Sequence, residues 1–301
     1  MSLKTLAKQT AIYGLSTIVL RLASWLLAPY YSRVIERVDI GINGDLLAMA
    51  AFINVIYMMG METSYFRFIK KLDEKEIFKK ANSIVFYNSL FWSILFFVFA
   101  TPIVNILQYP GKEIYIYLLA TILFCENLSN VPFARLRHQN KAFTFIRLKG
   151  LLIFLNIGLN IFFLSFLLTG KISLPFAIST DPVVLIFLAN LIPWTFIFLY
   201  FLKDIIKLES PISVIKSNNI FKYSLPLIIV GAAGMVNETF DRPMLKYLLP
   251  GNTKENLAEL GVYNTNYKLS IIMTLIIQGF RMGAEPYFFK ESSKKGAKAT
   301  Y

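Results

Sequence analysis

Apolar runs of about 20 residues follow one another along the whole chain, and short polar segments separate them. A helix needs a run of about that length to cross ~30 Å of hydrocarbon. The pattern therefore predicts an all-α polytopic membrane protein with eight spanning helices. The first run is too long for the apolar core of a signal peptide, so we expect it to be the first span. The expected spans are about 10–34, 40–66, 81–107, 113–134, 144–168, 183–202, 220–248 and 257–287.

Two helix pairs, one near each end of the chain, have the same layout. The stretch 41–67 opens on Gly and Asn, continues with an apolar middle and ends on Gly60-Met61-Glu62, and 261–290 repeats this order with Gly283-Ala284-Glu285. Upstream, Tyr13-Gly14-Leu15 matches Tyr223-Ser224-Leu225. Repeats in membrane proteins usually form two bundles that face each other across a substrate path.

The position of the repeat predicts the domain organisation. We expect a complete six-helix lobe over 1–207, a cytoplasmic connector over 208–219, and the first two helices of a second lobe over 220–301. Because six is an even number of spans, the two repeats would run parallel. Four further helices would complete the symmetry, so we interpret the chain as a C-terminally truncated fragment.

Composition supports the membrane class and explains the positive charge. The chain is 56% hydrophobic and 16% charged, whereas soluble domains are about 25% charged. Its net charge of +13 could indicate nucleic acid, but most Lys and Arg fall in every second connecting segment, starting with the N-terminus. This asymmetry predicts a cytoplasmic N-terminus and contacts with anionic lipids, and no nucleic-acid partner. The outer segments hold only Arg33, Arg37, Lys112, Lys171, Lys246 and Lys254.

Cysteine and histidine are too few for disulfide or metal chemistry. Cys125 and His138 are the only residues of their kinds, which excludes an internal disulfide and a multi-Cys/His metal site. We expect Cys125 in a helical core and His138 at the membrane surface. We predict no catalytic residue, no metal site and no cofactor other than a coupling ion, H⁺ or Na⁺.

Four cations remain that belong to no connecting segment; they lie inside expected spans, where each costs at least ~2.5 kcal/mol unless it faces protein or water. With a cytoplasmic N-terminus, Arg21 lies near mid-depth, Lys268 in the outer half, Arg281 near the inner end and Arg242 toward the outer end. Cations at successive depths suit an anionic head group that crosses the membrane, since Arg can grip phosphate bidentately and Lys acts as a point charge.

Polar residues continue along one face of the last helix and of two others. The alternatives are a helix–helix seam, which small and polar residues also form, and a water-filled cavity. For Arg21, Lys268 and Arg281 we favour the cavity, although Glu285 could pair with Arg281 inside the helix. The polar faces comprise Asn264, Tyr267, Ser270, Thr274, Gln278, Arg281 and Glu285 in the last helix, Gly231, Gly234, Asn237, Glu238, Asp241 and Arg242 in the seventh, and Thr10, Gly14, Thr17, Arg21, Ser24, Ala28 and Ser32 in the first.

Carboxylates could neutralise some of these cations. Glu238 precedes Arg242 by four residues, the order that favours an ion pair on a helix. Glu62 and Glu126 are candidate buried partners for the other cations. The sequence leaves open whether Glu62 and Glu126 form such pairs.

Four stretches carry a family resemblance: LAKQTAIYGLSTIVLRLASWLLAPYYSRVI, GMETSYFRF, FARLRHQNKAFTFIRLKGLLIFLNIGLNIFFL and GVYNTNYKLSIIMTLIIQGFRMGAEPYFFK. The chain resembles oligosaccharide flippases, the polysaccharide biosynthesis proteins of the multidrug/oligosaccharidyl-lipid/polysaccharide exporter superfamily. It covers the first eight of the twelve to fourteen helices usual there.

The resemblance implies two six-helix lobes around a V-shaped cavity lined mainly by helices 1, 2, 7 and 8. It also implies transfer of undecaprenyl-pyrophosphate-linked sugars from the cytoplasmic to the periplasmic leaflet of the bacterial cytoplasmic membrane. Basic lumen residues of such flippases engage the pyrophosphate, and Arg21, Lys268 and Arg281 are the candidates by depth and face. A lipid-linked oligosaccharide, the bilayer and a polysaccharide polymerase are the expected partners.

Three other hypotheses remain open. A cation-coupled multidrug exporter of the same superfamily would use acids such as Asp45, Glu238 and Asp241 as its ion site. A membrane-embedded glycosyltransferase or polymerase is disfavoured, because the outer loops are short and no large one carries paired acids. A fragment that lacks half of its cavity wall could also be inactive.

Overall fold

The computed structural model describes residues 25–69, 72–168, 181–210 and 218–268, together with 270 and 273. Every regular element in these ranges is helical, which confirms the all-α class. The elements of the first half, after a helix over 25–34, are α2 (Arg37–Met58), α3 (Met61–Phe68), α4 (Glu74–Val98), α5 (Ala100–Ile106), α6 (Glu113–His138), α7 (Ala142–Phe162), the π-helical η1 (Phe163–Leu167) and α8 (Pro182–Ile205). The second half contains α10 (Asn218–Thr239), α11 (Asp241–Leu248) and a helix over 253–268.

Within the described ranges, six helices are long and apolar enough to cross a membrane. They correspond to the expected spans two to seven, so the chain is a multi-pass membrane protein. The first and eighth expected spans lie partly outside the described residues, which leaves the count of eight untested. The six are Arg37–Phe68, Glu74–Val98, Glu113–His138, Ala142–Leu167, Pro182–Ile205 and Asn219–Thr239.

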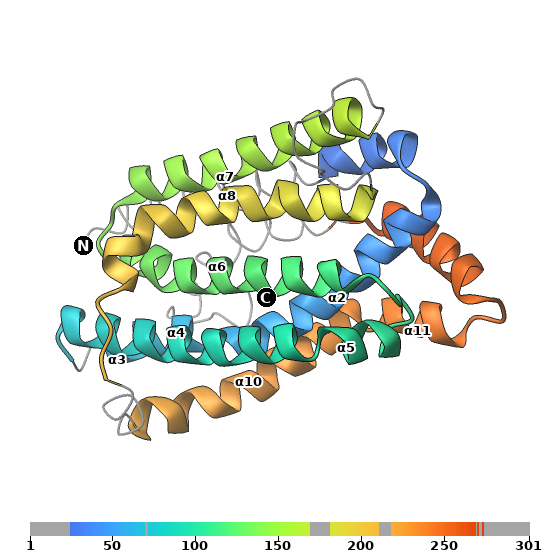
Figure 1. Cartoon of the computed structure of the whole chain (residues 1–301). Helices are drawn as coiled ribbons and strands as arrows, with labels where there is room; N and C mark the ends of the chain where they lie inside the picture. The colour runs from blue at the N-terminus through green and yellow to red at the C-terminus, as the bar shows by residue number, and fades with distance from the viewer. Residues whose placement is uncertain are drawn as a thin grey trace, which may run out of the picture.

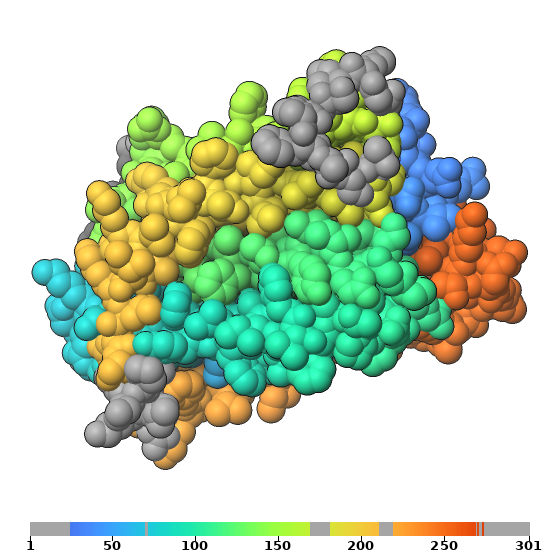
Figure 2. Space-filling model, in the orientation of Figure 1, coloured from blue at the N-terminus to red at the C-terminus, as the bar shows by residue number. Residues whose placement is uncertain are grey.

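The long helices lie side by side in one bundle (Figure 1). The central helix is α6, because 67% of its most apolar window is buried, more than in any other described span. Its residue Cys125 is buried there as a free thiol, as expected. Figure 2 shows α4, α5, α6 and α8 forming one continuous surface, with α10 along its lower edge. By contrast, only 11% of the apolar window of α10 is buried.

Three expected spans contain a break that sequence periodicity did not indicate. The third span, expected to be continuous over 81–107, is divided at Phe99 between α4 and α5. The second span is interrupted between α2 and α3, where Met59 and Gly60 both adopt positive φ, at 49° and 65°. Glycine takes this left-handed conformation without strain, which explains its position at the break. The seventh span, expected to be continuous over 220–248, ends instead at Thr239, and α11 begins as a separate helix at Asp241.

The second half of the chain packs along α2. The helix over 253–268 approaches α2 so closely that a Cβ atom at Gly41 would lie 1.9 Å from the carbonyl oxygen of Leu257. A Cβ atom at Gly261 would lie 2.0 Å from the carbonyl oxygen of Arg37. Both positions therefore require glycine, and this glycine seam (Arg37, Gly41, Leu257 and Gly261) brings the two backbones into direct contact.

Candidate functional site

A cavity of about 170 Å³ lies beside the glycine seam, between α2, the junction of α10 with α11, and the helix over 253–268. These elements belong to the second, seventh and eighth expected spans. We call it the cationic cavity, because two of its residues are Arg242 and Lys268. Its lining consists of Ile40, Asn43, Gly44, Leu47, Ala48, Thr239, Arg242, Asn264, Tyr267 and Lys268.

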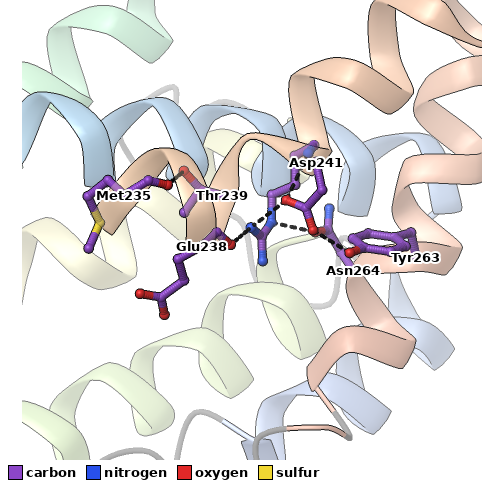
Figure 3. A network of polar contacts seen from close by, with 7 residues as sticks. Met235, Glu238, Thr239, Asp241, Tyr263 and Asn264 are labelled. Carbon is purple, nitrogen blue, oxygen red and sulfur yellow. Dashed lines mark hydrogen bonds and ion pairs between the residues drawn. The ribbon is translucent and has the colours of Figure 1, made fainter. Parts of the chain in front are cut away.

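Arg242 is held in the cavity wall by several contacts from the second half of the chain (Figure 3). Its Nε donates to the side-chain oxygen of Asn264 at 3.1 Å, and its Nη1 donates to the backbone carbonyl of Glu238 at 3.0 Å. The guanidinium carbon lies 4.7 Å from the ring centroid of Tyr267, a cation–π geometry. Arg242 is thus fixed in orientation before any ligand binds.

The spacing favoured Glu238 as the ion-pair partner of Arg242, and this prediction is wrong. Arg242 pairs with Asp241, at 3.2 Å between Nη1 and Oδ1, while Glu238 contributes only its backbone carbonyl. Figure 3 shows the carboxylate of Glu238 pointing away from this network. Asp241 also accepts a hydrogen bond from the hydroxyl of Tyr263. The break before α11 explains the difference, because it changes which acid faces the arginine.

Lys268 has no carboxylate partner in the described part of the chain. Its ammonium lies 5.2 Å from the ring centroid of Tyr31 and is close enough to Arg242 for the two like charges to repel. A cation inside a membrane span is normally paired, so this arrangement is typical of an anion-binding site. Two nearby polar atoms also lack partners there, the side-chain oxygen of Asn43 and the side-chain nitrogen of Asn264.

The other expected site residues fall into two groups. Arg21, Gln278, Arg281 and Glu285 lie outside the described residues. Glu62 lies on α3 and pairs with Arg137 at 2.5 Å, so its cation is neither Arg242 nor Lys268. Glu126 interacts electrostatically with Lys149, again away from the cationic cavity. Arg242, Lys268, Asn264 and Tyr267 are therefore the expected site residues that the structure brings together.

One buried ion pair among the described residues was missed by sequence reasoning. Lys246, expected in an outer connecting segment, is buried and lies 2.6 Å from Asp45 of α2. The signal that could have found it is Asp45 itself, an acid inside an expected span with no cation within four residues. An acid at that depth needs a distant partner. The apolar residues around Lys246 gave no indication of which helix would supply it.

The comparisons with known proteins agree with the sequence resemblance. A family model described as "Polysaccharide biosynthesis protein" matches residues 6–291, which include both halves of the chain. No curated protein and no solved structure matches. The chain therefore belongs to the polysaccharide biosynthesis protein family.

Proposed function

We propose that this protein transfers a lipid-linked oligosaccharide across the membrane and that the cationic cavity binds the phosphate groups of the lipid carrier. The observation that carries the proposal is Lys268, a cation without a carboxylate partner in the described residues, beside Arg242. Members of this family are generally transporters, which favours transport over catalysis.

The donors around the cavity suit a polyprenyl pyrophosphate. Arg242 uses Nε and Nη1 for protein contacts, and its Nη2 has no partner among the described residues. Lys268 supplies a point charge and Asn264 an unused N–H donor. Hydrogen bonds between charged groups contribute about 1.5–3 kcal/mol each, so two such cations account for strong discrimination between charged and neutral lipids.

The structure weakens the alternative of a cation-coupled multidrug exporter. Of its three candidate acids, Asp45 pairs with Lys246 and Asp241 pairs with Arg242. Only Glu238 keeps a carboxylate without a described ion pair, and that carboxylate points away from the Arg242 network (Figure 3). An acid that is already neutralised binds a coupling cation poorly, because the cation must first displace the resident one.

The proposal also includes a mechanism and an orientation. The two halves meet along α2, and alternating access requires them to separate at one end of the bundle while they close at the other. The basic connecting segments would face the cytoplasm and the α11 end the opposite side. The carrier would enter at the basic end, bind its phosphates in the cationic cavity and leave at the other end.

A flux assay tests the proposal. The full-length protein in proteoliposomes would be supplied with a fluorescent polyprenyl-pyrophosphate-linked sugar, and transfer between leaflets would be measured. We expect Lys268→Gln and Arg242→Gln to lower the transfer rate at least ~10-fold, the effect of about 1.4 kcal/mol. Lys254→Gln, at an exposed lysine of the same half, is the matched control and should leave the rate unchanged. Wild-type transfer in both cavity variants would refute the proposal.

A further inference from the structure

The buried ion pair between Asp45 and Lys246 joins the two halves of the chain. The Lys246 ammonium donates to Asp45 Oδ2 at 2.6 Å and to the backbone carbonyl of Leu107 at 2.7 Å. The hydroxyl of Tyr109 donates to the same Asp45 oxygen at 2.7 Å, and the Tyr109 ring lies 4.0 Å from the ammonium. The Lys246 side chain is 0% exposed and that of Asp45 7%, so both charges are removed from solvent.

Each member of the pair is attached to its own half. Asp45, Leu107 and Tyr109 belong to the first half. In the second half, the side-chain nitrogen of Asn256 donates to the backbone carbonyls of Lys246 and Leu249, each at 3.0 Å, which ties α11 to the helix over 253–268. If the two halves move apart as rigid units, Lys246 must leave Asp45 and the Leu107 carbonyl at the same time.

The pair lies next to the cationic cavity and close to the glycine seam. Lys246 is one helical turn beyond Arg242 on α11, and Asp45 follows Gly44, another cavity residue, on α2. The glycine seam joins Gly41 of α2 to Leu257 of the helix over 253–268. It lies beyond the cavity residues of these two helices, on the side away from the basic segments. Asp45 also lines an apolar cavity of about 280 Å³ that shares Ala48 and Thr239 with the cationic cavity.

We propose that Asp45 and Lys246 form a latch that holds the glycine seam closed, so that the cationic cavity opens to the outer side only when this ion pair breaks. A desolvated pair suits this role, because separating it exposes two uncompensated charges at once, so the contact is either made or broken. Because Arg242 and Lys246 share the short helix α11, opening the latch also moves a residue of the cavity. The inference assigns the gating of the cavity used in the proposed function, but it does not depend on which anion binds there.

Cysteine accessibility in intact cells tests the latch. The reporter is Asn43→Cys, in the cavity lining, in a full-length chain whose buried Cys125 is replaced by alanine, and the probe is a membrane-impermeant maleimide added outside. We expect slow labelling with the latch intact and labelling at least ~10-fold faster with Lys246→Met or Asp45→Asn. The exchange of both charges, Asp45→Lys with Lys246→Asp, should restore slow labelling.

The chain offers a matched control for this experiment. Lys112 and Asp181 form an ion pair of 2.5 Å at the same end of the bundle, but both belong to the first half and the Lys112 side chain is 47% exposed. Lys112→Met should therefore leave the labelling rate of the reporter unchanged.

A neutral double variant separates loss of the latch from loss of the fold. Asp45→Asn with Lys246→Met leaves no unpaired charge, so the fold should be recovered while labelling stays fast. The latch is refuted if the reporter protein with an intact Asp45–Lys246 pair is already labelled fast, or if neither Lys246→Met nor Asp45→Asn accelerates the labelling. It is also refuted if the neutral double variant is labelled as slowly as the reporter protein with the intact pair. The flux variants at Lys268 test the proposed function separately, because they leave the latch intact.

Discussion

Gly44 is the position where a single methyl group should disturb the cationic cavity most directly. A Cβ atom at Gly44 would lie 1.8 Å from the side-chain nitrogen of Asn264 and 2.5 Å from its Cγ. Asn264 would have to swing away and release its 3.1 Å hydrogen bond from Arg242. Losing a hydrogen bond to a charged group costs about 1.5–3 kcal/mol, and the higher helix propensity of alanine offsets about 1 kcal/mol. We therefore expect Gly44→Ala to lower the free energy of unfolding by about 0.5–2 kcal/mol.

The assay is thermal or denaturant unfolding of the purified protein in detergent, with Gly158→Ala as the control. Gly158 lies in α7 with nothing within 4 Å of an added Cβ atom, so its substitution changes helix propensity without a clash. A double-mutant cycle with Asn264→Ala identifies the cause. If the clash is with Asn264, the double variant is no less stable than Asn264→Ala alone. Equal behaviour of Gly44→Ala and Gly158→Ala, or strict additivity in the cycle, would refute the reasoning.

Three further predictions concern ion pairs and caps of different burial. Lys246→Met should lower the free energy of unfolding by about 3–5 kcal/mol, because it leaves Asp45 buried and unpaired. Glu62→Gln, at a 44% exposed side chain, should lower it by at most about 1 kcal/mol. The unfolding midpoints of the two variants test this difference. Tyr109→Phe removes one of the donors to Asp45 and should accelerate labelling of the Asn43→Cys reporter by less than Lys246→Met does. Burial opposes the charge of Asp181, but hydrogen bonds from Lys112 and Tyr115 outweigh it and hold the pKa of that carboxyl below its ordinary value. A carboxyl of this kind stabilises the fold at neutral pH and loses the effect as pH falls through its folded-state pKa, so Asp181→Asn should flatten the acid limb of a stability–pH curve.

The lengths of the apolar runs were sufficient to predict the helices, and the resemblance of a few stretches was sufficient to predict the family. The run lengths predicted eight spans, of which six appear in the described residues as helices long and apolar enough to cross a membrane, and the quoted stretches pointed to the family that the family model shows. The cost of burying a charge also singled out Arg242 and Lys268, which the structure places around one cavity, and their role there stays a prediction. The helix predictions succeed because they rest on the membrane as solvent, which acts on every residue of a span in the same way.

The sequence did not predict which residues form ion pairs with one another. Asp45 and Lys246 are 201 residues apart, and nothing in either local sequence encodes the approach of α11 to α2. The preference for Glu238 as the partner of Arg242 assumed a continuous helix, but α10 ends at Thr239 and Asp241 takes that place. A break of one residue rotates all later side chains around the helix axis, so local spacing fails wherever a break goes unrecognised.

Direct binding of the carrier's phosphate is the most decisive measurement. Purified protein in nanodiscs would be titrated with a short-chain prenyl pyrophosphate, with the corresponding neutral prenol as the comparison. The account predicts that wild-type protein binds the pyrophosphate and not the prenol, and that Lys268→Gln lowers the affinity at least ~10-fold while Lys254→Gln does not. Equal affinity of the wild-type and Lys268→Gln proteins would contradict the assignment of the cationic cavity as the phosphate site.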